Sequence, residues 1–169
     1  MDILVGYTSA HGSTGEIAAH MAERFSAAGF KAEARALETV EDADAYRAFV
    51  LGSAVHGQRW LDPAYAFLDA NSGLLGDRPL WIFSVGMPGA LRGPWKRLAF
   101  KEVPVILDSL PGDLPHRDHR LFAGVVTTRQ LPFAGRLLFR LMGGRFGDLR
   151  DWPAIDAWTD AIAAELAAG

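Results

Sequence analysis

The chain has 169 residues, half of them apolar, carries a formal net charge of −3 at pH 7 and contains no cysteine. This length suffices for one compact domain with its own core, and we expect residues 1–169 to form it. The lack of cysteine excludes disulfides, thiolate metal sites and thiol redox chemistry, so any redox function requires a bound cofactor. No apolar run approaches a membrane span, and the N-terminus does not have the pattern of a signal peptide, which predicts a cytoplasmic protein.

Strand and helix patterns alternate along the chain. Strand patterns occupy residues 3–7, 31–37, 48–53, 80–85 and 121–126. Helix patterns run from Glu16 to about Gly29, over 63–71, from about Pro94 with an interruption around Pro104, over 132–142 and from Pro153 onward. This alternation predicts an α/β fold, a doubly wound five-stranded parallel sheet in the order 2-1-3-4-5 with helices on both faces.

A hydroxyl-rich turn joins the first strand to the first helix. It reads Thr8-Ser9-Ala10-His11-Gly12-Ser13-Thr14, and no acidic side chain follows until Glu16. Together with the free amides and positive end of the helix, such a turn can hold a phosphate without a lysine. Neither a Walker loop nor a Gly-x-Gly-x-x-Gly fingerprint is present. The alternative is an ordinary capped helix start, but a cap needs only one hydroxyl.

Two further loops are expected at the same edge of the sheet. Residues 53–60 follow the third strand and residues 84–89 follow the fourth. In the order 2-1-3-4-5, ligands bind beyond the carboxyl ends of the first and third strands, with the fourth alongside. Both loops are apolar and carry glycine, which suits a flat ring. The three loops therefore favour a mononucleotide with a large aromatic base.

The three loops resemble those of the flavodoxins, through Thr8–Thr14, Gly52–Gly57 and Phe83–Gly86. More narrowly, the chain is similar to the menaquinone-dependent protoporphyrinogen oxidases, a flavodoxin-like family. This similarity rests on Ala123-Gly124, the basic segment 132–142 and the ending 147–152. It implies non-covalent FMN, with the phosphate on residues 8–14 and the ring between loops 54–60 and 84–89. The implied cofactor-binding residues are Thr8, Ser9, Ala10, His11, Gly12, Ser13, Thr14, Ala54, Val55, His56, Gly57, Trp60, Ser84, Val85 and Gly86.

Three of these residues have competing interpretations. We expect Trp60 to stack on the flavin, the alternative being that it caps the hydrophobic edge beneath the helix that follows. His56 could donate a hydrogen bond to the flavin or a substrate, or simply face solvent. His11 contributes its backbone amide and is assigned no catalytic role. No catalytic residue and no metal ligand can be named from the sequence.

Charge is distributed unevenly along the chain. Residues 92–145 hold 10 basic against 4 acidic side chains, whereas residues 1–91 hold 6 against 11. The basic stretch is either an ordinary surface fluctuation or a face for an anionic partner, such as a carboxylate-bearing substrate or an acidic lipid surface. We expect an inserted basic helical segment at about 128–147. Its helix 132–142 is expected to pack on the sheet through its leucines, with peripheral contact to the inner face of the membrane as the alternative.

The favoured function is an FMN-dependent oxidoreductase. Electrons would pass from a reduced organic substrate, plausibly a porphyrinogen as in porphyrin biosynthesis, to a quinone-type acceptor. Carboxylates of such a substrate could meet Arg92, Arg97, Arg136 or Arg140. The alternative is a flavodoxin-type electron carrier that docks to protein redox partners. We expect no nucleic-acid partner, leave homo-oligomer formation open, and expect Asp151 to cap the last helix.

Overall fold

The protein is described by a computed structural model covering residues 2–86, 101, 103–112, 114–127, 133–141 and 146–168. Its main sheet has five parallel strands in the order β2-β1-β3-β5-β6, which confirms the predicted order. They are β1 (Asp2–Thr8), β2 (Lys31–Ala36), β3 (Ala48–His56), β5 (Leu80–Val85) and β6 (His119–Phe122). A sixth, short strand, β4 (Arg59–Trp60), pairs antiparallel with the end of β3.

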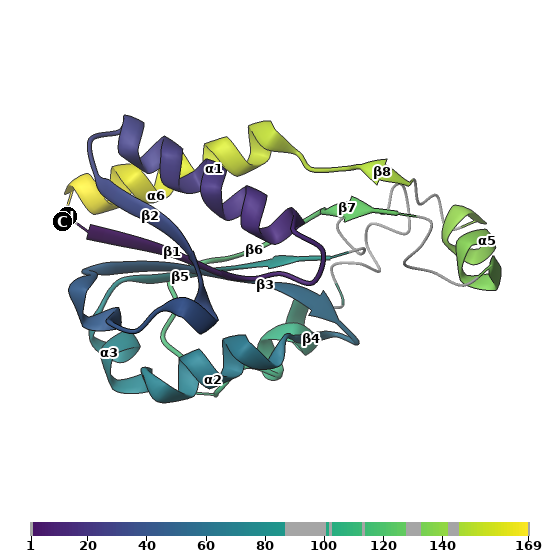
Figure 1. The fold of residues 1–169 in the computed structure, drawn as a ribbon. Helices are drawn as coiled ribbons and strands as arrows, with labels where there is room; N and C mark the ends of the chain where they lie inside the picture. Colours follow the sequence, from purple (N-terminus) through teal and green to yellow (C-terminus); the bar gives the residue numbers. More distant parts are fainter. Residues whose placement is uncertain are drawn as a thin grey trace.

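Helices cover both faces of this sheet, as expected (Figure 1). On one face lie α1 (Ser13–Ala27) and α6 (Trp152–Ala168). On the other face lie α2 (Asp62–Ala70) and α3 (Ser72–Asp77). The alternating residues of the buried strands divide between two apolar clusters, one beneath α1 and α6 and one beneath α2. Short 3₁₀ turns at Leu37–Thr39 and Ala43–Ala45 connect β2 to β3.

Two expectations about elements need correction, and two short elements were not predicted. The predicted last strand is divided, because β6 ends at Phe122 and β7 (Val125–Val126) pairs with β8 (Gly147–Asp148) in a separate two-stranded sheet. Pro104 lies within helical residues 103–108 and does not interrupt them. Helix α3 and hairpin strand β4 were not predicted, because both are short and carry no clear periodicity.

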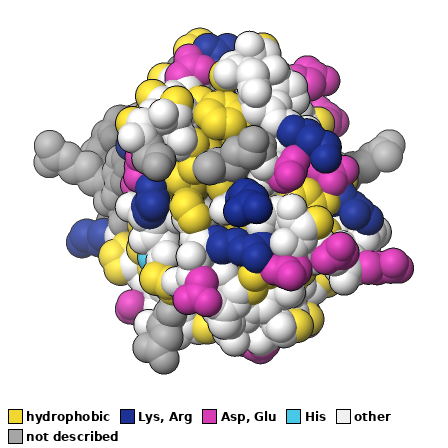
Figure 2. Space-filling view, turned by 90° about the vertical axis from the view of Figure 1, so that its left-hand side faces the viewer, with side chains coloured by type: hydrophobic (Ala, Val, Ile, Leu, Met, Phe, Trp, Pro, Cys, Tyr) yellow, Lys and Arg dark blue, Asp and Glu magenta, His cyan; other side chains and the backbone are white. Residues whose placement is uncertain are grey.

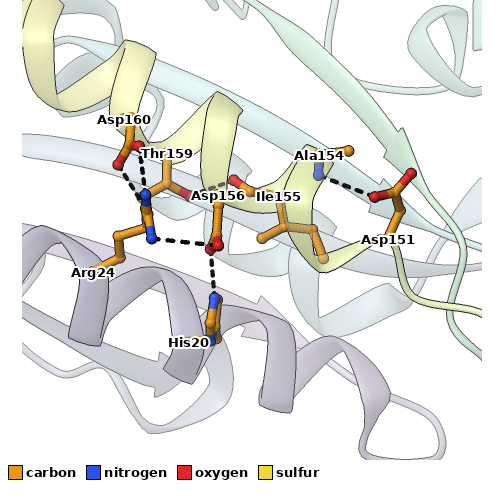
Figure 3. A network of polar contacts seen from close by, with 8 residues as sticks. All are labelled: His20, Arg24, Asp151, Ala154, Ile155, Asp156, Thr159 and Asp160. Carbon is orange, nitrogen blue, oxygen red and sulfur yellow. Dashed lines mark hydrogen bonds and ion pairs between the residues drawn. The ribbon is translucent and has the colours of Figure 1, made fainter.

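Helices α1 and α6 are joined by a polar network (Figure 3). The Arg24 guanidinium donates from Nε and Nη2 to the two carboxylate oxygens of Asp160, at 2.6 and 2.5 Å. Its Nη1 lies 3.3 Å from Asp156, whose other oxygen is 2.6 Å from His20 Nε2. Both acidic residues lie one turn apart on α6 and face α1, so the network fixes how the two helices pack on the sheet.

The start of α6 is capped as the sequence predicts. The Asp151 carboxylate accepts a hydrogen bond from the Ala154 amide at 3.1 Å, which satisfies one of the free amides of the first turn (Figure 3). One turn further on, the buried Thr159 hydroxyl donates to the Ile155 carbonyl at 2.8 Å.

The end of the molecule that carries both termini has intermixed acidic and basic side chains (Figure 2). Lys31 Nζ lies 3.4 Å from Asp2 at the start of the first two strands. Arg117 Nη1 lies 2.5 Å from Glu165 on α6. These charges pair with one another, whereas the loops singled out by the sequence lie at the opposite end of the strands.

Candidate functional site

The three loops meet at the carboxyl edge of the sheet. The register aligns Thr8 of β1 with Ser53 of β3, and Ser53 with Ser84 of β5. The segments that follow these residues, 9–14, 54–60 and 85–86, therefore leave neighbouring strands at the same level. The predicted binding segments are thus brought together as expected for this strand order.

The turn 8–14 presents unused donors at the start of α1. Gly12 has a left-handed backbone, φ 92°, and its amide donates to the Ser9 hydroxyl at 2.9 Å. The first helical hydrogen bond runs from the Glu16 amide to the Gly12 carbonyl at 3.0 Å. Three amides precede that bond and have no acceptor within the helix, those of residues 13–15. Ala10 and His11 are exposed at the tip of the turn.

Thr14 carries the most specific signal in this turn. Its side chain is fully buried, and Oγ1 is the one buried side-chain polar atom without a hydrogen-bond partner in the part of the chain that the structure describes. An unpaired buried hydroxyl costs stability, so its presence beside three free amides calls for a ligand. Hydroxyl and amide donors at a helix N-terminus suit a phosphate. The residues present therefore fit the phosphate of a flavin mononucleotide.

Thr8 lies apart from these free donors. Its buried hydroxyl donates to Ser53 Oγ at 2.7 Å, which ties β1 to β3. Ser53 in turn donates to the Ala54 carbonyl at 2.9 Å and accepts from the Leu61 amide at 3.0 Å. The hydroxyl of Thr8 is thus used inside the sheet, and its contact with the cofactor stays a prediction.

The second loop is a tight hairpin between β3 and β4. Its two central residues, Gly57 and Gln58, both have left-handed backbones, with φ 57° and 64°. Two successive positive φ angles define a hairpin turn whose twist matches its strands. His56 and Gly57 are exposed and Ala54 and Val55 half-buried, so this loop offers backbone and small apolar surface. Within the part of the chain that the structure describes, no hydrogen bond or ion pair assigns the His56 ring to a partner.

Trp60 is a core residue, which corrects the expectation that it stacks on a flavin. Its side chain is 2% exposed and packs in the cluster beneath α2. The indole Nε1 donates to Ser84 Oγ at 2.8 Å. A buried tryptophan needs a partner for its N–H, and Ser84 on the neighbouring strand supplies it. The alternative interpretation, a cap beneath the following helix, describes this position.

His119 extends the hydrogen-bonded pair of Trp60 and Ser84, and the sequence analysis did not identify it. Its Nε2 lies 2.9 Å from Ser84 Oγ, the same hydroxyl that accepts from Trp60. Burial lowers the pKa of His119 from 6.5 to about 4, with repulsion from His116 as a smaller cause. His119 is therefore neutral at pH 7. No local pattern indicated its burial, because the predicted strand begins two residues later, at Leu121.

The low pKa of His119 predicts acid sensitivity. Between pH 6.5 and about 4 the unfolded chain binds a proton at this side chain and the folded protein does not. Neutral His119 makes its full contribution to the stability of the folded protein above pH 6.5. This contribution is lost as the pH falls toward about 4, which lowers the free energy of unfolding by about 3 kcal/mol. Urea unfolding at pH 7 and pH 5 measures the part of this change that is lost above pH 5, about 2 kcal/mol. H119Q should flatten this dependence, whereas H56Q, at an exposed loop position, should leave it unchanged.

The third loop is described only at its start. Val85 is buried, and the Gly86 amide donates to the Phe122 carbonyl at 3.1 Å, which holds β5 beside β6. The rest of the predicted ring-flanking loop, together with Arg92 and Arg97, lies outside the described residues.

In helix α5 (Phe133–Leu141), Leu137 and Leu141 do not pack on the main sheet, contrary to the expectation. Phe139 is its buried contact, in a small cluster with residues of β7 and Phe146. Leu137 and Leu141 are 56% and 72% exposed. Arg140 lies over the Phe146 ring, 5.6 Å from its centre. The helix therefore rests on the β7–β8 extension and leaves an apolar edge uncovered by the described residues.

Comparison with known proteins identifies the class. The family model of the flavodoxin domain (Flavodoxin_5) matches residues 4–145, and the chain belongs to this family. Family membership indicates FMN as the cofactor and a redox role. No curated protein sequence matches the chain.

Solved structures share the fold at low sequence identity. A flavodoxin from Streptococcus pneumoniae TIGR4 is 13% identical with a TM-score of 0.56, each chain covering 99% of the other. A flavodoxin from the domain Archaea is 17% identical with a TM-score of 0.53, over 85% of this chain and 97% of its own. Rubredoxin:oxygen oxidoreductase from Desulfovibrio gigas is 15% identical with a TM-score of 0.58, over 99% of this chain but 36% of its own. The chain thus spans about a third of that enzyme.

The described residues show neither a metal-binding cluster nor a membrane-spanning helix. Within them, no group of three or more histidine, aspartate or glutamate side chains is placed to hold a metal ion. None of the helices described is both long and apolar enough to cross a membrane.

Proposed function

We propose that the protein is an FMN-dependent oxidoreductase whose cofactor binds at the edge formed by the three loops. The unpaired, buried hydroxyl of Thr14 beside the free amides of residues 13–15 carries this proposal. The phosphate would accept hydrogen bonds from these donors and from Ser9. The ring would lie between residues 54–57 and 84–86, at the carboxyl ends of the neighbouring strands β3 and β5.

Bound FMN supplies the capacity to take up and release two electrons, and the protein determines where the ring lies and what reaches it. The half-buried Ala54 and Val55 would exclude water from one side of the ring. The loop stretches 8–14, 54–57 and 84–86 contain no aspartate, glutamate, lysine or arginine. We therefore assign these residues to binding and orientation.

The proposed substrate is a reduced organic molecule with carboxylates, and the proposed acceptor is a quinone. In this reaction the substrate loses two electrons and two protons, and the quinone gains them to become a quinol. The sequence from 119 to 147 contains five arginines and no acidic residue, so it can face carboxylates without repulsion. A porphyrinogen is the particular substrate implied by the resemblance to the menaquinone-dependent protoporphyrinogen oxidases.

The alternative function is a flavodoxin-type electron carrier that docks to protein redox partners. It is favoured by the flavodoxins that share the fold over nearly their whole length. A stepwise reductive titration of the FMN-loaded protein, followed by absorbance, separates the two. One two-electron step, with turnover of porphyrinogen and quinone, supports the enzyme. Two resolved one-electron steps without such turnover would establish the carrier and refute the enzyme.

Helix α5 would bring the protein to the membrane, where a lipid quinone resides. Leu137 and Leu141 lie one turn apart on its exposed edge, and Arg140 lies between them. This combination is typical of a helix that lies on an anionic lipid surface. One short helix gives weak and reversible binding, so the expected contact is peripheral.

Replacing both leucines by aspartate tests the membrane contact. Wild-type protein should co-sediment with vesicles of phosphatidylglycerol and phosphatidylcholine, and the L137D/L141D variant should lose most of this binding because charge replaces apolar area. V105D is the matched control, since Val105 is 44% exposed elsewhere on the protein. Equal binding by L137D/L141D and the wild type would rule out α5 as the contact.

A further inference from the structure

The β7–β8 extension lies directly beside the turn 8–14. A Cβ atom built on Gly124 would stand 3.0 Å from Ser13 Oγ, so the backbone after β6 touches the start of α1. The Leu149 amide donates to the Gly124 carbonyl at 3.3 Å and brings the segment after β8 to the same place. The C-terminal part of the chain thus forms an outer wall of the proposed phosphate site.

Arg150 links this wall to α1. Its side chain is 9% exposed, and its guanidinium lies 4.7 Å from the centre of the Trp152 ring. Nε and Nη2 donate to the Asp148 carboxylate at 2.8 and 2.5 Å, and Nη1 donates to Glu16. The hydrogen bonds to Asp148 and Glu16 raise the pKa of Arg150, so the guanidinium is charged at any working pH. The guanidinium is therefore a fixed positive charge, held between Asp148 on β8 and Glu16 on α1.

Of the two carboxylates that bind Arg150, Glu16 is the one at the helix end where an anion would bind. It lies in the first turn of α1, immediately after the free amides of residues 13–15, and its side chain is largely exposed. A carboxylate there is favoured by the helix dipole, but it repels any anion bound at the same helix end. Pairing with Arg150 offsets part of this charge without placing a cation in the turn itself, since the guanidinium is shared with Asp148.

We propose that Arg150 is a positioning residue that offsets part of the negative charge of Glu16 and thereby raises the preference of the site for phosphorylated over unphosphorylated flavin. The proposal rests on the proposed function, in that residues 8–14 receive the phosphate. Without the guanidinium, the Glu16 charge would act on a phosphate dianion at the same helix end. The expected loss of affinity is roughly tenfold for FMN, and riboflavin, which has no phosphate, should be unaffected.

A double-mutant cycle tests this pairing. The full chain is freed of flavin, and the affinities for FMN and riboflavin are measured by flavin fluorescence in wild type, R150Q, E16Q and R150Q/E16Q. R150Q should lower the FMN-to-riboflavin affinity ratio about tenfold. The double variant should restore most of the ratio, because the unpaired carboxylate is then absent. The ratio is the readout because a loosened loop would weaken both ligands together.

Two control variants separate the loss of the Arg150 charge from lost hydrogen bonds and from the loss of any arginine–glutamate pair. R150K keeps the positive charge while losing the paired hydrogen bonds, so it should keep the ratio near the wild-type value even if the protein is less stable. R117Q breaks a comparable arginine–glutamate pair at the opposite end of the strands and should leave the ratio unchanged. If R150Q does not fold, R150K and E16Q still test the proposal. E16Q should raise the FMN-to-riboflavin affinity ratio, and R150K should preserve it.

The outcomes separate this proposal from the proposed function. A wild-type protein that binds FMN and riboflavin equally would refute the phosphate turn, and with it both proposals. A wild-type preference for FMN that R150Q leaves intact would overturn the role of Arg150 alone. Equal weakening of both flavins in R150Q, with no rescue by E16Q, would also overturn it.

Discussion

The T14V variant should be more stable than the wild type when free of flavin, yet bind FMN much more weakly. Valine removes the one unpaired buried hydroxyl of the described residues, which should raise the free energy of unfolding by about 1 kcal/mol. The same hydroxyl is a proposed donor to a charged phosphate, and its loss should weaken FMN binding about tenfold or more. Urea unfolding and fluorescence titration measure the two effects.

Thr159 provides the matched control for this experiment. It is equally buried, but its hydroxyl donates to the Ile155 carbonyl at 2.8 Å. T159V should therefore give no such gain in stability and leave FMN affinity unchanged. A T14V protein that binds FMN as the wild type does would show that this hydroxyl faces no phosphate. A loss of stability in T14V would mean that the hydroxyl has a partner in the flavin-free protein.

Substituting Gly52 with alanine should be the most damaging small change in the sheet. A Cβ at this position would stand 2.1 Å from Cζ of Phe83, a separation that no real contact allows. Phe83 is fully buried and packs against the rings of Phe122 and Trp158, so it has little room to move. We expect a loss of about 3 kcal/mol in the free energy of unfolding and a melting temperature lower by roughly 10 °C.

Gly73 is the comparison for this substitution. A Cβ there would meet nothing within 4 Å, and the residue lies in α3 with an ordinary backbone. G73A should leave the protein as stable or slightly more stable, because alanine favours helix. If G52A changed the free energy of unfolding as little as G73A does, the packing of Phe83 against Gly52 would be wrong.

The fold was predictable because its strands are unusually clear in sequence. The cores of β1, β3 and β5 are unbroken apolar runs, typical of parallel strands covered on both faces. The predicted last strand was too long because its apolar run continues through Ala123-Gly124. The close approach of Gly124 to Ser13, a contact of residues 111 positions apart, divides this run between two sheets, and no local pattern reveals it.

The site was predictable in outline for a related reason. Strand order alone places the ends of β1, β3 and β5 together, so the three loops could be named from sequence. The roles of individual side chains were harder to predict from the sequence. Trp60 and Ser84 are 24 positions apart, and Arg150 and Glu16 are 134 apart, and each pairing depends on how distant segments pack. The exposed leucines of α5 were misjudged because a helical stripe does not say what it packs against.

The most direct test of the phosphate turn compares FMN and riboflavin binding to the wild-type chain by calorimetry. These ligands share the ring system and differ by the phosphate, so the ratio of their affinities isolates the contribution of residues 8–14. We predict that FMN binds about a hundredfold more tightly, as expected for two or more hydrogen bonds to a charged group. Equal affinities, or no binding of either flavin, would contradict the assignment of this turn as a phosphate site.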